Sequence, residues 1–162
     1  MRPCTAIVFV IVSFVTAAAA VDGQSVLVID KERDEEVTLA PPLAVRDGLS
    51  EALFSGGLIV FDLPVDAVPA TAAEVLRLAR SAGADVVVQI DASYTGAPGT
   101  TPRRIAARGA WTVTSVGTGA ALASGSIDAT NADREKDVDR DRLGRELGGL
   151  IAAKVAAALA AQ

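Results

Sequence analysis

The pattern of apolar positions predicts five strands along the chain. Three segments rich in valine, isoleucine and leucine, 25–30, 58–63 and 85–94, have the length and apolar character of buried strands. Two further segments, 105–116 and 121–129, are joined by a Gly-Thr-Gly turn that is too short for a crossover between parallel strands. The charged residues 31–36 (KERDEE) then read as a turn after the first strand.

Apolar residues at helical spacing predict three helices. The first follows Pro41-Pro42, because proline is tolerated in a first helical turn, and it ends at Gly56-Gly57. The second begins with a capping box from Thr71 to Glu74 and ends at Gly83. The third runs from about 141 to 161, with the apolar stripe Leu143, Leu147, Leu150, Ile151, Val155 and Leu159.

The resulting order, β-α-β-α-β-β-β-α, predicts a two-layer domain of the mixed α/β (α+β) class. Its first half alternates like a parallel α/β unit, and its last three strands form an antiparallel meander before the long final helix. One face of the mixed sheet is apolar and should be covered by helices. We expect Trp111 to pack in the core or against the sheet rather than to form a flat surface for a ligand. The other face is polar enough to meet water or a partner, and it carries Gln89, Asp91, Ser93, Arg108, Thr112, Thr114, Ser124, Ser126 and Asp128.

The first twenty residues have the pattern of a secretory signal peptide. Arg2 precedes an apolar core of ten residues, 6–15, and small residues ending in Ala18-Ala19-Ala20 fit a cleavage site before Val21. The apolar core is short for a membrane span, so the alternative of an uncleaved anchor is less favoured. We therefore expect residues 1–20 to be the signal and residues 21–162 to be a single exported domain, periplasmic or secreted.

Composition excludes several functions. The chain has no histidine, which removes zinc sites, Ser-His-Asp triads and imidazole catalysis, and its one cysteine, Cys4, lies within the signal. Removing the signal changes the formal charge from −5 to −6, because Arg2 is lost and no acid is. An acidic excess argues against a nucleic-acid surface. We expect no cofactor and no stable membrane insertion after cleavage.

Several short segments together resemble a known family. They are Gly83-Ala84-Asp85 before a valine-rich strand, the Trp111-Thr112-Val113 strand, the Gly117-Thr118-Gly119 turn, and Leu122-Ala123-Ser124-Gly125. This arrangement, over roughly residues 26–159, is similar to the amino-terminal domain of TolB and to related periplasmic domains of curli-secretion and flagellar-assembly proteins. The resemblance implies a non-catalytic envelope interaction domain. The resemblance implies no functional residue in this chain, because the matched positions are structural turns.

Three side-chain patterns could carry chemistry, and each is incomplete. Asp137, Asp139 and Asp141 have the spacing of a calcium loop, but the required glycine and glutamate positions hold Arg142 and Gly148. Ser124 or Ser126 could act with Lys31 or Lys154 as a Ser-Lys pair. Asp62, Asp66 and Asp91 could supply paired carboxylates for a hydrolase. The glycine-rich segments 96–99 and 117–119 precede no helix, so they are not phosphate-binding loops.

The favoured function is that of an adaptor that binds another protein of the cell envelope. Arg103, Arg104 and Arg108 form the chain's one arginine-rich cluster beside a Gly/Pro loop, and they are the candidate partner-binding residues. The alternatives are an exported enzyme, such as a carboxylate-based hydrolase, or a structural component that self-associates through an exposed strand edge.

Overall fold

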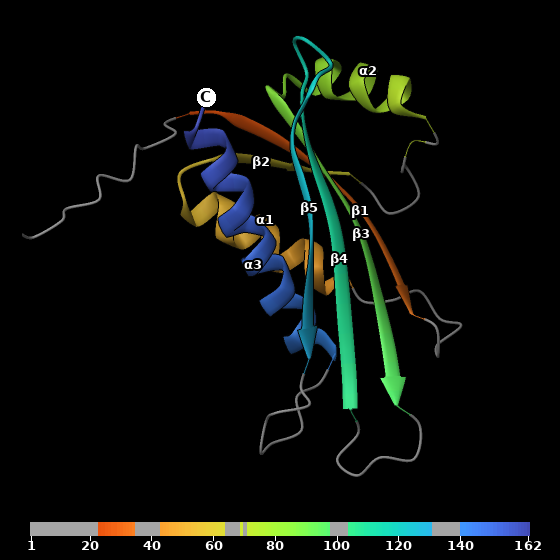
Figure 1. Cartoon of the computed structure of the whole chain (residues 1–162). Helices are drawn as coiled ribbons and strands as arrows, with labels where there is room; N and C mark the ends of the chain where they lie inside the picture. The colour runs from red at the N-terminus through yellow and green to blue at the C-terminus, as the bar shows by residue number, and fades with distance from the viewer. Residues whose placement is uncertain (1–22, 35–42, 64–68, 70, 98–103, 131–139) are drawn as a thin grey trace, which may run out of the picture.

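The computed structural model describes residues 23–34, 43–63, 69, 71–97, 104–130 and 140–162, and its elements follow the predicted order. The strands are β1 (Ser25–Asp34), β2 (Ile59–Asp62), β3 (Val86–Ala97), β4 (Arg104–Ser115) and β5 (Ala121–Thr130). The helices are α1 (Ala44–Ser55), α2 (Ala72–Ala82) and α3 (Arg140–Ala160). Figure 1 shows the sheet with α1 and α3 on one side.

The five strands form one mixed sheet in the order β2-β1-β3-β4-β5. The strand β1 pairs in parallel with β2 and β3, and the antiparallel meander β3-β4-β5 completes the sheet. The predicted fold class, with a parallel first half and an antiparallel second half, is therefore confirmed. Because β5 lies at one border, its outer side has no neighbour in the sheet.

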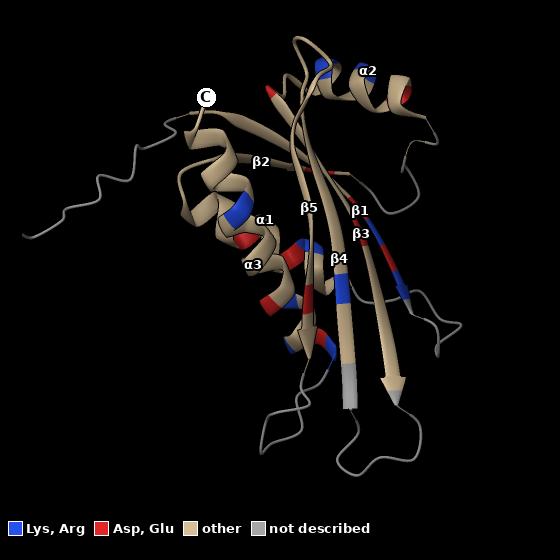
Figure 2. Cartoon of the chain, viewed as in Figure 1, with Lys and Arg blue, Asp and Glu red and all other residues tan. Residues whose placement is uncertain are grey.

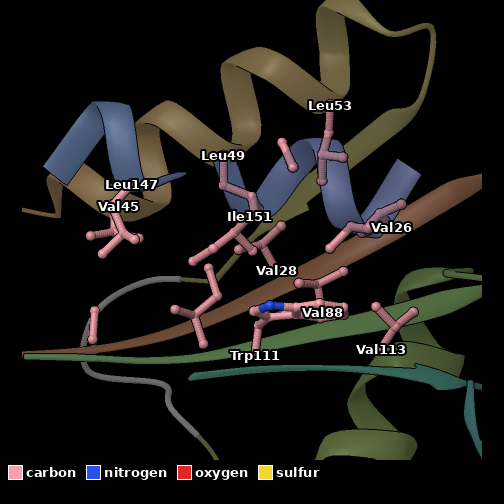
Figure 3. Close-up of a cluster of buried hydrophobic side chains, with 14 of the residues drawn as sticks. Val26, Val28, Val45, Leu49, Leu53, Val88, Trp111, Val113, Leu147 and Ile151 are labelled. Carbon is pink, nitrogen blue, oxygen red and sulfur yellow. The ribbon is translucent and has the colours of Figure 1, made fainter. Parts of the chain in front are cut away.

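Helices α1 and α3 cover one face of the sheet and form the main core with it (Figure 3). Alternate residues of each strand point toward these helices, as the sequence pattern predicts. Trp111 and Val113 belong to this core, so the expected packing role of Trp111 is confirmed. The stripe of α3 that faces the sheet consists of Leu143, Leu147, Ile151, Val155 and Leu159.

The backbones of α1 and α3 approach each other closely through glycine. A Cβ added to Gly148 would lie 2.6 Å from the backbone nitrogen of Leu49, and one added to Gly48 would lie 2.6 Å from the Cα of Arg145. One turn earlier in α3, a Cβ on Gly144 would lie 2.7 Å from the Cβ of Ala44. Any side chain at these glycines would therefore push the two helices apart.

Helix α2 lies on the opposite face of the sheet, near the end where β1 begins (Figure 1). Its capping box from Thr71 to Glu74 forms as predicted, and Gly83 ends it in a left-handed conformation with a φ of 74°. A second, smaller core lies beneath it, made of Leu27, Ile29, Val75, Ala79, Ala84, Val87 and Val116. The sequence pattern does not predict this position of α2.

The Gly-Ala-Asp segment before β3 has a structural role. Asp85 accepts hydrogen bonds from the backbone nitrogen of Ser25, at 2.8 Å, and from its hydroxyl, at 2.7 Å. These bonds hold the pKa of the Asp85 carboxyl below its usual value. They join the beginning of β1 to the beginning of β3, so the motif fixes the register of two parallel strands.

Two sequence predictions about individual residues are wrong. Residues 31–34 do not form a turn but continue β1, since Lys31 to Asp34 pair with Asp91 to Tyr94 of β3. Burial alternates along this segment as in any strand, with Glu32 buried and Lys31 and Arg33 exposed, but all three residues are charged, so the pattern of apolar residues does not show it. Leu150 is half exposed and does not belong to the buried stripe of α3. No helix in the described residues is long and apolar enough to cross a membrane.

Candidate functional site

A polar surface extends over the part of the sheet that α2 leaves uncovered. We call it the polar face, and it consists of the outward residues of β1, β3, β4 and β5. The registers place these side chains on one side of the sheet, opposite α1 and α3, as predicted. They are Lys31, Arg33, Gln89, Asp91, Ser93, Arg108, Ala110, Thr112, Thr114, Ser124, Ser126 and Asp128.

Two ion pairs between neighbouring strands lie on the polar face. Arg108 on β4 donates from Nε to the carboxylate of Asp128 on β5 at 2.9 Å, and Arg33 on β1 pairs with Asp91 on β3. Figure 2 shows charged residues of both signs along these strands. All four side chains remain about half exposed or more, so solvent screens the pairs and they add little to stability. Their main effect is to balance the charge of the face.

The polar face contains a hollow of about 250 Å³ beside the Arg33–Asp91 ion pair. Lys31, Gln89, Asp91 and Thr112 line it, and Ala110 provides a small side chain between Asp91 and Ser126 in the strand register. The hollow therefore offers an ammonium group, an amide, a carboxylate and a hydroxyl within one small space. This set contains both hydrogen-bond donors and acceptors, which suits a peptide group or a polar side chain.

The three predicted partner-binding arginines are only partly described. Arg108 lies on the polar face, where it is paired with Asp128 rather than free to meet a partner carboxylate. Arg104 is the first residue of β4, and its side chain lies outside the described residues. Arg103 lies outside the described residues altogether. The register places Arg104 opposite Ala97, at the end of the β3–β4 pair and away from the hollow.

The carboxylate and serine pairs considered from the sequence do not come together. Asp62 pairs in register with Val28 on the α1–α3 side of the sheet, whereas Asp91 lies on the polar face. Ser126 and Lys31 share the polar face, but they are three strand spacings apart, or about 14 Å. Lys154 is exposed on α3, on the opposite side of the sheet from Ser126. Asp66, Asp137 and Asp139 lie outside the described residues.

A buried acidic cluster, which the sequence pattern conceals, joins β1, β3 and α1. Glu32 accepts the backbone N–H of Val45 at 2.8 Å and that of Arg46 at 3.3 Å, and it accepts the hydroxyl of Tyr94 at 3.0 Å. The first turn of α1 has no side-chain cap of its own, so a carboxylate on a strand performs that role. The regular alternation from Asp30 to Arg33 is the one sequence signal that could have revealed it.

Asp30 lies beside this cluster, with its carboxyl next to that of Glu32. It is 8% exposed. Burial, reinforced by the nearby Glu32 carboxylate, raises the pKa of Asp30 to about 9. The folded protein therefore holds a proton on this carboxyl more tightly than the unfolded chain does. Because α1 and α3 cover it, we assign the cluster to the architecture rather than to a reaction.

Solved structures with a similar fold come from bacterial proteins. A PelC dodecamer from Paraburkholderia phytofirmans matches with a TM-score of 0.61 and 18% identity, over 88% of this chain and 92% of that chain. The hypothetical protein CT253 from Chlamydia trachomatis matches with a TM-score of 0.63 and 15% identity, over 86% of this chain and 99% of that chain. The lipoprotein GNA1162 from Neisseria meningitidis matches with a TM-score of 0.51 and 18% identity, over 86% and 99%.

TolB from Acinetobacter baumannii also matches, with a TM-score of 0.48 and 15% identity, over 88% of this chain and 30% of TolB. That likeness is too distant to transfer a function. No family model and no curated protein matches the chain. The resemblance to the TolB family thus remains a prediction, whereas the fold itself is shared with several bacterial proteins.

Proposed function

We propose that this chain is an exported, non-catalytic domain of the bacterial cell envelope that binds a protein partner through the polar face. The observation that carries the proposal is the uncovered part of the sheet, where polar side chains of β1, β3 and β4 line a hollow. A rigid sheet holds these groups at fixed spacings, so a partner with matching donors and acceptors binds without reordering them.

The location in the envelope rests on two observations. Residues 1–20 have the sequence of a signal peptide, and one of the structures with a similar fold is a lipoprotein. Intact-mass measurement of the exported protein tests the expected amino terminus at Val21. Retention of residues 1–20 would instead favour an anchored protein.

The separation of the candidate catalytic groups supports a binding function over a hydrolase. A carboxylate pair for glycoside hydrolysis must flank one bond from about 5 to 9.5 Å apart. Asp62 and Asp91 lie on opposite faces of the sheet, so they cannot flank one substrate bond. The hollow holds Asp91 in an ion pair with Arg33, which suits recognition better than proton transfer.

The proposed contact can be tested by site-specific photo-cross-linking in cells. A photoreactive amino acid replaces Thr112, which lines the hollow, and in a matched variant it replaces Lys154, which is exposed on α3 on the other side of the sheet. We expect an adduct with another envelope protein from position 112 and little or none from position 154.

The same experiment contradicts the proposal if the adduct forms only from position 154. Adducts of equal yield from both positions would also argue against it, because they would indicate random collision. Thermal unfolding of both variants checks that the substitutions leave the fold intact.

Assembly with further copies of the same chain is compatible with this function. PelC, one of the proteins with a similar fold, forms a dodecamer. An adaptor that assembles presents several copies of its polar face, which raises its avidity for a repetitive partner.

A further inference from the structure

The outer edge of β5 is a long border of the sheet that has no neighbouring strand among the residues that the structure describes. β5 has ten residues and pairs with β4 on one side. On its other side, no strand of the described residues pairs with it. The unpaired N–H and C=O groups of such an edge are a template for another strand.

The sequence of β5 contains few of the features that protect edge strands. The segment ALASGSIDAT has no lysine, arginine or proline, and its single charge, Asp128, is already paired with Arg108. A register irregularity between Val113 and Thr114 affects only the beginning of the strand. Soluble proteins usually protect an edge of this length with charges, prolines or bulges along it. An unprotected edge therefore indicates a surface that is covered in the working protein.

Gly125, near the middle of β5, lies directly over the indole of Trp111. A Cβ at Gly125 would lie 3.0 Å from Cζ2 and 3.2 Å from Nε1 of the indole. Trp111 is 8% exposed, and its Nε1–H group has no acceptor within the described residues. A buried indole N–H normally finds a partner, because leaving it unsatisfied costs free energy. The indole thus lies directly beneath the strand that forms the border of the sheet.

We propose that β5 of a second copy pairs with this edge in antiparallel register, centred on Gly125, to form one continuous sheet across a twofold axis. In this register Ala123 lies opposite Ile127 of the second copy on the side of α1 and α3, and both are half-buried apolar residues. On the polar face, Ser124 lies opposite Ser126 of the second copy. The pairing thus matches apolar with apolar side chains and small polar with small polar ones.

Charge and size favour a second copy over another occupant. The two Asp128 residues lie three positions from the centre in opposite directions, so they do not face each other. The central residues Ser124, Gly125 and Ser126 are small, so neither backbone is kept from a close approach. The twofold arrangement also places the two polar faces side by side, because opposite residues of an antiparallel pair point to the same side.

The register can be tested with charges at the two central serines, using the exported chain alone in sedimentation velocity over a concentration series. In S124K/S126K each lysine would face a lysine of the second copy, and we expect dimerisation at least about tenfold weaker than in the wild type. In S124K/S126E each lysine would face a glutamate instead, and we expect dimerisation at or above the wild-type strength. Both serines are exposed, so the monomer tolerates either variant.

Circular dichroism and thermal unfolding of the monomers confirm that the fold persists. A wild-type chain that stays monomeric at its highest soluble concentration would overturn the inference. A dimer that S124K/S126K leaves unchanged would place the contact elsewhere, and loss of the dimer in both variants would rule out this register. Because no partner is present, these outcomes are independent of the proposed adaptor function.

Discussion

The hydroxyl of Tyr94 on β3 lies where a side chain at position 144 of α3 would begin. A methyl group on Gly144 would overlap the Tyr94 oxygen and would come within 2.7 Å of the Cβ of Ala44. The same hydroxyl donates to Glu32, which caps α1. Tyr94 therefore joins the sheet to both covering helices, and the absence of a side chain at residue 144 makes that contact possible.

Replacing Gly144 by alanine should destabilise the protein by about 1–3 kcal/mol, because the added methyl group overpacks the contact with Tyr94 and Ala44. Gly149→Ala is a matched control in the same helix, since nothing lies within 4 Å of its added Cβ. That control should raise stability by about 0.5–1 kcal/mol through helix propensity. Urea unfolding of both variants measures the difference, and equal effects would contradict the close packing.

Glu32→Ala should lower stability by about 1–3 kcal/mol, because the N–H of Val45 and the hydroxyl of Tyr94 lose a buried acceptor. Glu32→Gln keeps an oxygen acceptor and should cost less. Glu51→Ala, at an exposed position of α1, serves as the control and should change stability by less than about 0.5 kcal/mol. Guanidinium unfolding followed by circular dichroism compares the three variants. A neutral result for Glu32→Ala would mean that water caps α1 equally well.

Asp30→Asn should make the protein more stable at alkaline pH. The folded pKa of about 9 exceeds the usual 3.8, so the folded state holds the proton more tightly than the unfolded state. The stability contributed by this proton is fully present below about pH 4 and is lost as the pH rises toward 9. The advantage of the Asn variant over the wild type should therefore grow with pH, by up to about 1.4 kcal/mol per pH unit.

Unfolding free energies of both proteins at pH 5, 7 and 9 test this dependence. A difference between the two proteins that does not change with pH would show that Asp30 is ionised in the folded state.

Leu147→Ala should lower stability by about 2–5 kcal/mol, since Leu147 is fully buried between α3 and the sheet and its truncation leaves a cavity. Leu150→Ala in the same helix removes a half-exposed side chain and should have a much smaller effect. Thermal unfolding distinguishes the two. A loss within about 0.5 kcal/mol at Leu147 would indicate that α3 is detached from the sheet in solution.

Charge reversal at Arg103 and Arg104 should weaken capture of an acidic partner, slow its association and reduce the salt dependence of that association, while leaving thermal stability nearly unchanged. Arg77→Glu, on an exposed position of α2, changes the net charge by as much as one of the two reversals and serves as the control. Association rates at low and high salt give the comparison. Unchanged capture would exclude the β3–β4 loop end as a contact, and loss of folding would assign the arginines to structure.

The sequence predicts the element order and the polar face because both depend on local periodicity. The alternation of Gln89, Asp91 and Ser93 with buried neighbours is visible without any tertiary information. The alternation from Asp30 to Arg33 could have placed Glu32 on the buried face of β1, but it does not predict the partners of Glu32. Glu32 is buried because the amino terminus of α1 and the Tyr94 hydroxyl converge on it, and those partners lie 13 and 62 residues away in sequence.

The position of α2 and the exposure of Leu150 are also set by tertiary packing. α2 lies over Leu27, Ile29 and Val87. In these strands the apolar residues on this face look the same in the sequence as the apolar residues on the other face, so the pattern does not show which face a helix covers. Leu150 follows two glycines in α3 and falls just outside the arc that contacts the sheet. Helical spacing alone does not show whether a residue at the border of the buried side of a helix, such as Leu150, contacts the sheet.

The contact between α1 and α3 through Gly48 and Gly148 has a consequence for reading mutational data. Neither position carries a reactive group, yet each should reject all other amino acids, since any side chain would meet the backbone of the facing helix. In a deep mutational scan the two sites would resemble an active centre, intolerant and clustered in space. Substitutions at the two sites would fail because the helices α1 and α3 are too close together for a side chain, and not because either site takes part in a reaction.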